Sequence, residues 1–389
     1  MNLAVIQLLV LASGVASGVE AFLPSQTGQH RQRKPTATPS LQSQIIPMVK
    51  PLSSSSTSVA AEIMEGTGND IPNWRTFVLP LEGDEASESN ITQILQQRPQ
   101  WSATTYATSL KLYDQFTATN DPYVAPGIQE ALNVLDHAYR LYGPESVICS
   151  FNGGKDAVVI LQLMLAAHAH YYRNQEQNLV PIRPRALYFE HADEFPEILQ
   201  YLQDTVCECD LDFVAFARGI KFNEGLEVLV RNNRPAGSSP SGPVFPMAFV
   251  LGTRAGDPNA GDQEFFSPSS HSMPPFMRVN PVLEWNYGQV WYFLRLFNLK
   301  YCKLYDQGYT SLGNTKDTFP CPALAVPGSS SNEGGLPKFR PAYMLQDYSQ
   351  ERAGRTKKDK KSTLEVSTKE STGNTSSTLD NIAFPPRSV

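Results

Sequence analysis

The chain has 389 residues, of which 41% are hydrophobic and 18% are charged, a composition typical of a globular core with polar ends. Its 32 Lys and Arg stand against 38 Asp and Glu, so the formal net charge is −6. This charge gives no support for a basic nucleic-acid-binding face, and we expect small-molecule partners and no nucleic acid. The five cysteines include no CxxC pair, which argues against a four-thiolate zinc site and against a closed disulfide framework.

Both ends of the chain differ in composition from its middle. Residues 1–21 are predicted to be a signal peptide, because they begin with an apolar run that is too short to span a bilayer. Residues 22–90 are predicted to be a transit-peptide-like segment and disordered linker, because their first forty residues contain Lys and Arg but no Asp or Glu. Residues 356–389 carry the basic cluster KKDKK and a polar remainder, which predicts a disordered tail.

The junction of the two leader segments, VEAFLPS, places Phe22 after the expected signal cleavage point. It resembles the two-part leaders of algae with complex plastids. We therefore expect a plastid (chloroplast) protein that has no membrane association in its mature form. The alternative is a protein of the secretory pathway with a disordered N-terminal arm.

Residues 91–355 remain as a single folded domain, in which apolar runs alternate with helical patterns. The first of the helical patterns covers residues 127–143 and predicts a helix with one apolar face and Gly143 as its C-cap. The continuous apolar run 146–151 predicts a strand buried on both faces, and residues 155–170 predict a buried helix. Three more predicted strands, at 186–190, 212–217 and 246–254, alternate with two more predicted helices, at 194–206 and 223–232.

This alternation predicts an α/β fold with a Rossmann-like parallel sheet and helices on both faces. Ligands of such a sheet bind beyond the carboxyl ends of the strands. Three segments that follow predicted strands should therefore lie at one edge of the sheet: 150–156, 190–193 and 252–257. Residues 291–297 are rich in aromatic side chains and are expected to be helix core.

The segment SFNGGKD, residues 150–156, joins the first predicted strand of this alternation to a helix. Glycines let backbone N–H groups approach phosphate oxygens closely, and the first helical turn offers unpaired donors and the positive end of the helix dipole. Lys155 would add a positive charge. The loop is neither a Walker A loop nor GxGxxG, and a bare GGK would equally suit a tight turn.

The whole string resembles the pyrophosphate loop (PP-loop) of the PAPS reductase-like ATP pyrophosphatase superfamily, whose common form is Ser-Gly-Gly-Lys-Asp-Ser. Asn152 before the glycines is the variant of the eukaryotic FAD synthases. Three later stretches resemble the same branch: FVLGTRAGDPN (249–259), the long segment 278–313, and FRPAYMLQDYSQERAGR (339–355). The loop departs from the pattern at Ala157, where the superfamily often has Ser and this branch often has Cys.

The resemblance implies FMN adenylylation, in which ATP and FMN give FAD and pyrophosphate, with Mg²⁺ as cofactor and a monomeric enzyme. It also implies a PP-loop fold with a C-terminal helical and loop extension that binds flavin. The implied catalytic residues are Asn152, Asp156, Arg352 and Arg355, with Asp156 also the metal ligand. The implied ATP-binding residues are Ser150, Phe151, Gly153, Gly154, Lys155 and Glu190. The implied flavin-binding residues are Gly252, Arg254, Asp257, Asn280 and Trp285.

Two alternatives stay open at this point. A sulfonucleotide (PAPS/APS) reductase shares the expected fold, but it needs a nucleophilic cysteine in a C-terminal motif, and no cysteine follows Cys321. A catalytically silent nucleotide- or flavin-binding protein would not need the loop and both arginines. The stretches AGDQEFFSPSSHS (260–272) and PGSSSNEGG (327–335) are interpreted as loop insertions.

Overall fold

The computed structural model describes residues 74–77, 95–175, 179–235, 238–239, 241–258, 260–327 and 338–356, with the backbone alone for 74–77. The predicted signal peptide, the C-terminal tail from residue 357 and most of the 327–335 stretch lie outside the described residues. Residues 74–77 form a strand, although the segment 22–90 was predicted to be linker. This strand pairs in parallel with a strand at residues 212–216. Because the partner is distant in sequence, the composition around residues 74–77 does not indicate the pairing.

A seven-stranded sheet has the order β1-β4-β3-β2-β5-β7-β6. All neighbouring pairs are parallel except β6 with β7, which is antiparallel. The strands are β1 (Trp74–Phe77), β2 (Val147–Ser150), β3 (Arg185–Phe189), β4 (Asp212–Phe216), β5 (Ala248–Val250), β6 (Phe266–Pro268) and β7 (Met277–Val279). The parallel sheet predicted from the sequence is confirmed. Edge strand β6 lies inside the 260–272 stretch that was interpreted as a loop insertion.

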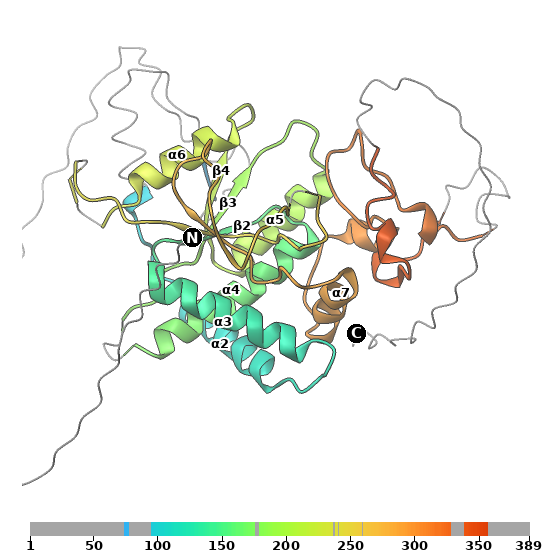
Figure 1. Ribbon diagram of the computed structural model, residues 1–389, viewed down its shortest axis with the longest axis horizontal. Coiled ribbons are helices and arrows are strands. Elements are labelled where there is room, and N and C mark those ends of the chain that lie inside the picture. The colour runs from blue at the N-terminus through green and yellow to red at the C-terminus, as the bar shows by residue number, and fades with distance from the viewer. Residues whose placement is uncertain are drawn as a thin grey trace, which may run out of the picture. The chain divides into compact units, whose positions relative to one another are not determined.

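Helices cover both faces of the sheet, as the sequence predicted (Figure 1). Along each central strand, alternate side chains enter two different clusters of buried residues: Ala186 enters one and Leu187 the other. Helix α6 (Phe222–Asn232) packs on the Leu187 face, because Leu226, Leu229 and Val230 belong to that cluster. Helices α4 (Lys155–Arg173) and α5 (Pro196–Glu208) cover the other face, and α2 (Ala103–Ala118) and α3 (Ala125–Tyr142) pack against α4.

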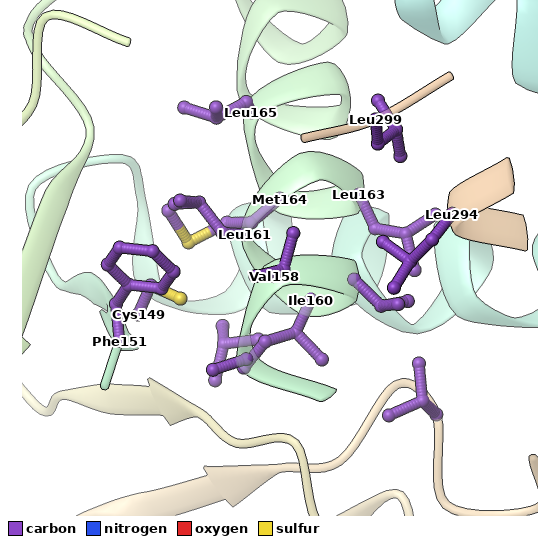
Figure 2. Close-up of a cluster of buried hydrophobic side chains, with 14 of the residues drawn as sticks. Cys149, Phe151, Val158, Ile160, Leu161, Leu163, Met164, Leu165, Leu294 and Leu299 are labelled. Carbon is purple, nitrogen blue, oxygen red and sulfur yellow. The ribbon is translucent and has the colours of Figure 1, made fainter. Parts of the chain in front are cut away.

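Helix α4 is the core helix of the domain. Figure 2 shows its apolar side chains between Cys149 and Phe151 on one side and Leu294 and Leu299 on the other. Because neighbours surround it, the helix needs no polar face, which accounts for the nearly unbroken apolar sequence from Ala157 to Ala169. No helix in the described part of the chain is both long and apolar enough to cross a membrane.

The predicted helices and strands agree with the structure to within a few residues. Gly143 caps α3 with φ +75°, as expected for a glycine at a helix end. Helix α2 had not been predicted. Most of the residues expected as helix core belong to α7 (Tyr287–Leu296), in which Trp291, Phe293 and Leu294 are fully buried, whereas Phe297 follows the helix and is half-buried.

After α7 the chain forms an extension of short 3-10 turns, which the structure places at Lys303–Gln307, Pro322–Leu324, Ala342–Met344 and Tyr348–Gln350. Isolated bridges join Thr318 to Arg355 and Ala325 to Phe339. The hydroxyl of Thr310 donates a hydrogen bond to the carbonyl oxygen of Glu351 at 2.7 Å. These contacts carry the end of the described chain back to the carboxyl edge of the sheet.

Candidate active site

The loop between β2 and α4 is shaped by its own residues. The Gly154 N–H donates to Oδ1 of Asn152 at 3.0 Å, and Gly153 has φ +74°. A residue with a Cβ is strained at that angle, so glycine suits this turn. The Lys155 N–H donates to the Tyr305 hydroxyl at 2.7 Å. Two of the backbone donors expected to bind phosphate are therefore already paired, and Asn152 holds the turn.

This loop lies where the strand order reverses, since the chain runs outward from β2 to β3 and β4 and then returns to β5 on the other side. Crevices at such points are the usual ligand sites of parallel sheets. A cavity of about 370 Å³ lies there. Its lining includes Ser150, Asn152 and residues 154–157 of the loop, the segment 251–254 after β5, and Glu351 and Arg352 of the extension, whereas the predicted ATP-binding residue Gly153 does not line it.

Four charged side chains form a closed ring of alternating sign at this cavity. The Lys155 ammonium lies 3.0 Å from Oδ2 of Asp156 and 2.5 Å from Oε1 of Glu351. The Arg254 guanidinium lies 3.0 Å from Oδ1 of Asp156 and 2.6 Å from the same Glu351 oxygen. Both cations are buried, with 3% and 6% of their side chains exposed. The ring therefore joins the start of α4, the end of β5 and the C-terminal extension.

The ring perturbs the acid–base behaviour of its members. Burial alone would raise the pKa of the Glu351 carboxyl, but Lys155 and Arg254 together lower it below its ordinary value. Burial alone would lower the pKa of Arg254, whereas Asp156 and Glu351 raise it. Glu351 is thus a carboxylate and Arg254 a guanidinium cation at neutral pH.

A second cavity, of about 380 Å³, lies beyond β3 and β4. It is lined by residues 187–192 and by Arg218, Gly219, Ile220 and Phe222. Burial raises the pKa of Glu190 there, and Arg218 partly opposes this effect. Ser150 and Asn152 line both cavities, so the two meet at the end of β2.

Three predicted binding residues lie in the interior. The Phe151 side chain is fully buried in the core (Figure 2), and its N–H donates to the Leu187 carbonyl. Trp285, the predicted flavin-stacking residue, is 6% exposed and packs edge-on against Phe293 with ring centroids 5.4 Å apart. The buried Asn280 amide donates to Gln263 and to the Glu264 carbonyl. Within the described residues none of the three lines either cavity.

The two predicted catalytic arginines lie in different surroundings. Arg352 lines the first cavity, is exposed, and makes no ion pair with any described residue. Arg355 pairs with Asp317 at 3.2 Å and donates to the Leu312 carbonyl at 2.9 Å. Arg352 is thus free to meet an anion, whereas Arg355 also fastens the 312–317 loop.

The described residues form no metal cage for a Mg²⁺ ion, but Asp156 could supply a single carboxylate ligand. Across the described residues no group of three His, Cys, Asp or Glu side chains could hold a metal. Each carboxylate oxygen of Asp156, the predicted ligand, lies 3.0 Å from a buried cation. Its Oδ1 accepts no hydrogen bond from the described residues although it lies beside Arg254, and it could contribute one ligand to an ion that is held mainly by substrate phosphates.

Sequence reasoning missed Glu351 and Tyr305, which both contact the loop. Glu351 belongs to the ERAGR string, but no local pattern marked its carboxylate as a partner of Lys155, which is 196 residues away. Tyr305 lies in the long segment 278–313 and, with its side chain buried, accepts a hydrogen bond from the loop. Of the histidines, His168 is buried in the core, whereas His191 is exposed and lines the second cavity.

A parallel sheet with a Gly-Gly-Lys-Asp loop at the reversal point and a polar cavity around it defines a nucleotide-using α/β protein of the PAPS reductase-like class. The model of the phosphoadenosine phosphosulfate reductase domain matches residues 244–320. Candida glabrata FMN adenylyltransferase in complex with FAD and inorganic pyrophosphate has the same fold, with a TM-score of 0.56 and 22% identity over 67% of this chain and 99% of that one.

Two curated relatives narrow the class. The "Probable FAD synthase" of Schizosaccharomyces pombe is 33% identical over 239 residues, which are 59% of this chain and 80% of that protein. The protein of the same name in Caenorhabditis elegans is 33% identical over 232 residues, which are 59% of this chain and 40% of that protein. The chain belongs to the FAD synthase family. The sulfonucleotide reductase alternative is not favoured.

Proposed function

We propose that adenylyl transfer from ATP to FMN takes place where the two cavities meet, beside Asn152. The observation that carries this proposal is that Ser150 and Asn152 line both cavities. In this arrangement adenosine occupies the cavity of Glu190, and FMN occupies the cavity of Arg254 and Arg352. The reacting phosphates lie between them, over the loop.

The reaction needs no covalent enzyme intermediate. An FMN phosphate oxygen attacks the α-phosphorus of ATP, the bond from that phosphorus to the bridging oxygen of the β-phosphate breaks, and pyrophosphate leaves. The protein contributes positioning and charge stabilisation. Because Oδ1 of Asn152 accepts the Gly154 N–H, its Nδ2 group is the one left to donate to a phosphate oxygen. The exposed guanidinium of Arg352 would meet the charge that develops on the departing pyrophosphate.

ATP would enter as its magnesium complex, with the ion held by the phosphates and not by a protein cage. Among the described residues no three His, Cys, Asp or Glu side chains form a metal site, which supports this reading. Arg355 would act mainly by holding the 312–317 loop. We expect the enzyme to act as a monomer, which light scattering coupled to size-exclusion chromatography measures.

We also propose delivery to a plastid, which the composition of residues 22–61 and the position of Phe22 support. The test fuses residues 1–70 to a fluorescent protein in an alga with complex plastids, with and without Phe22→Ala. Plastid fluorescence that depends on Phe22 is expected. Secretion of both fusions would contradict the proposal.

The test of the activity incubates the chain with Mg-ATP and FMN and separates the flavins by chromatography. FAD should appear in equal amount to pyrophosphate, and omission of either substrate should abolish both. A folded protein that binds ATP or FMN but forms no FAD would be the silent binding protein of the alternative reading.

A further inference from the structure

Glu351 is the member of the charge ring that comes from the C-terminal extension. Its single oxygen Oε1 contacts both buried cations, at 2.5 Å from Lys155 and 2.6 Å from Arg254. The glutamate carbonyl accepts a hydrogen bond from Thr310, so backbone and side chain are both held. The carboxylate therefore ties the extension both to the start of α4, through Lys155, and to the segment after β5, through Arg254.

The ring has no net positive charge to offer a phosphate, since two cations face two carboxylates and Arg254 also lies 3.5 Å from the Asp257 carboxylate. Removal of one partner from a buried ion pair is strongly destabilising, which keeps such pairs intact. Lys155 and Arg254 therefore stay paired with Asp156 and Glu351 and are not free to bind a phosphate. Attraction for the substrate phosphates must come from outside the ring, and Arg352 is an exposed cation on the same cavity.

Arg352 directly follows Glu351 in the chain. The ion pairs of the Glu351 carboxylate therefore also fix the position of the Arg352 backbone at the cavity. We propose that Glu351 is a positioning residue, which holds Arg352 over the phosphate-binding loop through Lys155 and Arg254 and contacts neither ATP nor FMN itself. The proposal rests on the proposed function, because Arg352 is positioned for adenylyl transfer. It also reassigns Lys155 and Arg254 as anchors of the extension.

The test is a double-mutant cycle on the full chain, with Glu351→Gln, Arg352→Ala and the double variant. Glu351→Gln keeps the side-chain shape and removes the charge. We expect kcat to fall roughly 10- to 100-fold, as for a catalytic group displaced by about 1 Å. The KM for ATP should stay the same or fall, because the ring gains one positive charge. In the Arg352→Ala background, adding Glu351→Gln should lower kcat by a further factor of less than about two, because the two changes remove the same function.

Glu227→Gln is the matched control, because Glu227 pairs with Arg231 within α6 and neither residue lines either cavity. It should leave kcat and KM unchanged. If Glu351→Gln fails to fold, Glu351→Asp serves in its place: it keeps the charge but is one methylene too short to reach both cations. It should lower kcat with little change in KM.

Two results would overturn the proposal while wild-type protein forms FAD: wild-type kcat in the Glu351 variants, or effects that multiply in the double variant. A raised KM for ATP would show instead that Glu351 or its partners bind substrate. If the wild type forms no FAD, the proposed function fails, and the role of Glu351 fails with it.

Discussion

Gly252 lies directly against Asp156. A Cβ at position 252 would be 3.1 Å from both the Cβ and the carbonyl carbon of Asp156, tighter than nine in ten such contacts in proteins. The segment after β5 can therefore approach the first turn of α4 only because residue 252 has no side chain. This approach closes the crevice around the loop and places Arg254 within reach of Asp156.

Gly252→Ala should accordingly separate these two segments. We expect a loss of about 1–3 kcal/mol in the free energy of unfolding, the usual cost of overpacking, and a fall in kcat because Arg254 moves with the segment. Denaturant unfolding and steady-state kinetics measure both. Gly256→Ala is the control, since a Cβ there meets nothing within 4 Å. If Gly252→Ala and Gly256→Ala changed the free energy of unfolding and kcat by equal amounts, the close approach of residue 252 to Asp156 would have no special role.

Asn152 combines a structural and a chemical role that substitution can separate. Asn152→Asp keeps the oxygen that accepts the Gly154 N–H but loses the Nδ2 donor, whereas Asn152→Ala loses both. We expect both variants to lower kcat by about 10²-fold or more, with a smaller change in the KM for ATP. Asn152→Ala should in addition lower the melting temperature. If Asn152→Asp retained wild-type kcat, the donor role would be wrong.

Arg355 is held by Asp317 and by the Leu312 carbonyl, and its guanidinium lies against Gly313. Arg355→Ala should release the 312–317 loop and lower kcat more than it raises the KM for ATP. Asp317→Asn, which removes only the ion pair, should have a smaller effect in the same direction. Limited proteolysis of the loop provides a readout that is independent of activity. An unchanged proteolysis pattern in Arg355→Ala would contradict the fastening role.

His168 predicts how stability depends on pH. Burial lowers its pKa from 6.5 to about 4, although the hydrogen bond of Nε2 with the Ile182 carbonyl partly opposes this. Because the unfolded chain binds this proton more tightly than the folded chain, stability falls as pH falls from about 6.5 to about 4. The loss is about 3 kcal/mol for a shift of this size.

Denaturant unfolding between pH 4 and pH 8 tests this prediction with His168→Gln, which can still donate to Ile182 but does not titrate. The free energy of unfolding of the wild type, minus that of the variant, should be smaller at pH 4 than at pH 7, because only the wild type loses stability by protonating residue 168. Parallel curves over the whole range would show that His168 does not contribute.

The order of strands and helices was predictable because each element of a parallel sheet carries its own apolar signal. The phosphate loop was predictable because its residues are contiguous. Trp285 shows where such reasoning fails: an aromatic residue in sequence looks the same whether it faces a cavity or, as here, packs on Phe293. Lys155 was predicted to bind phosphate, but its partner Glu351 is 196 residues away and could be found only from the fold. Strand β1 depends on its distant partner β4 in the same way.

Adenylyl transfer to FMN can be tested most directly by following the phosphorus atoms of ATP through the reaction. Wild-type protein is incubated with FMN and ATP labelled either at the α-phosphorus or at the γ-phosphorus, and the products are separated. Adenylyl transfer predicts that the α-label appears in FAD and the γ-label in pyrophosphate, in equal amounts. Release of the α-label as AMP without FAD, or of the γ-label as free phosphate before any pyrophosphate, would contradict it.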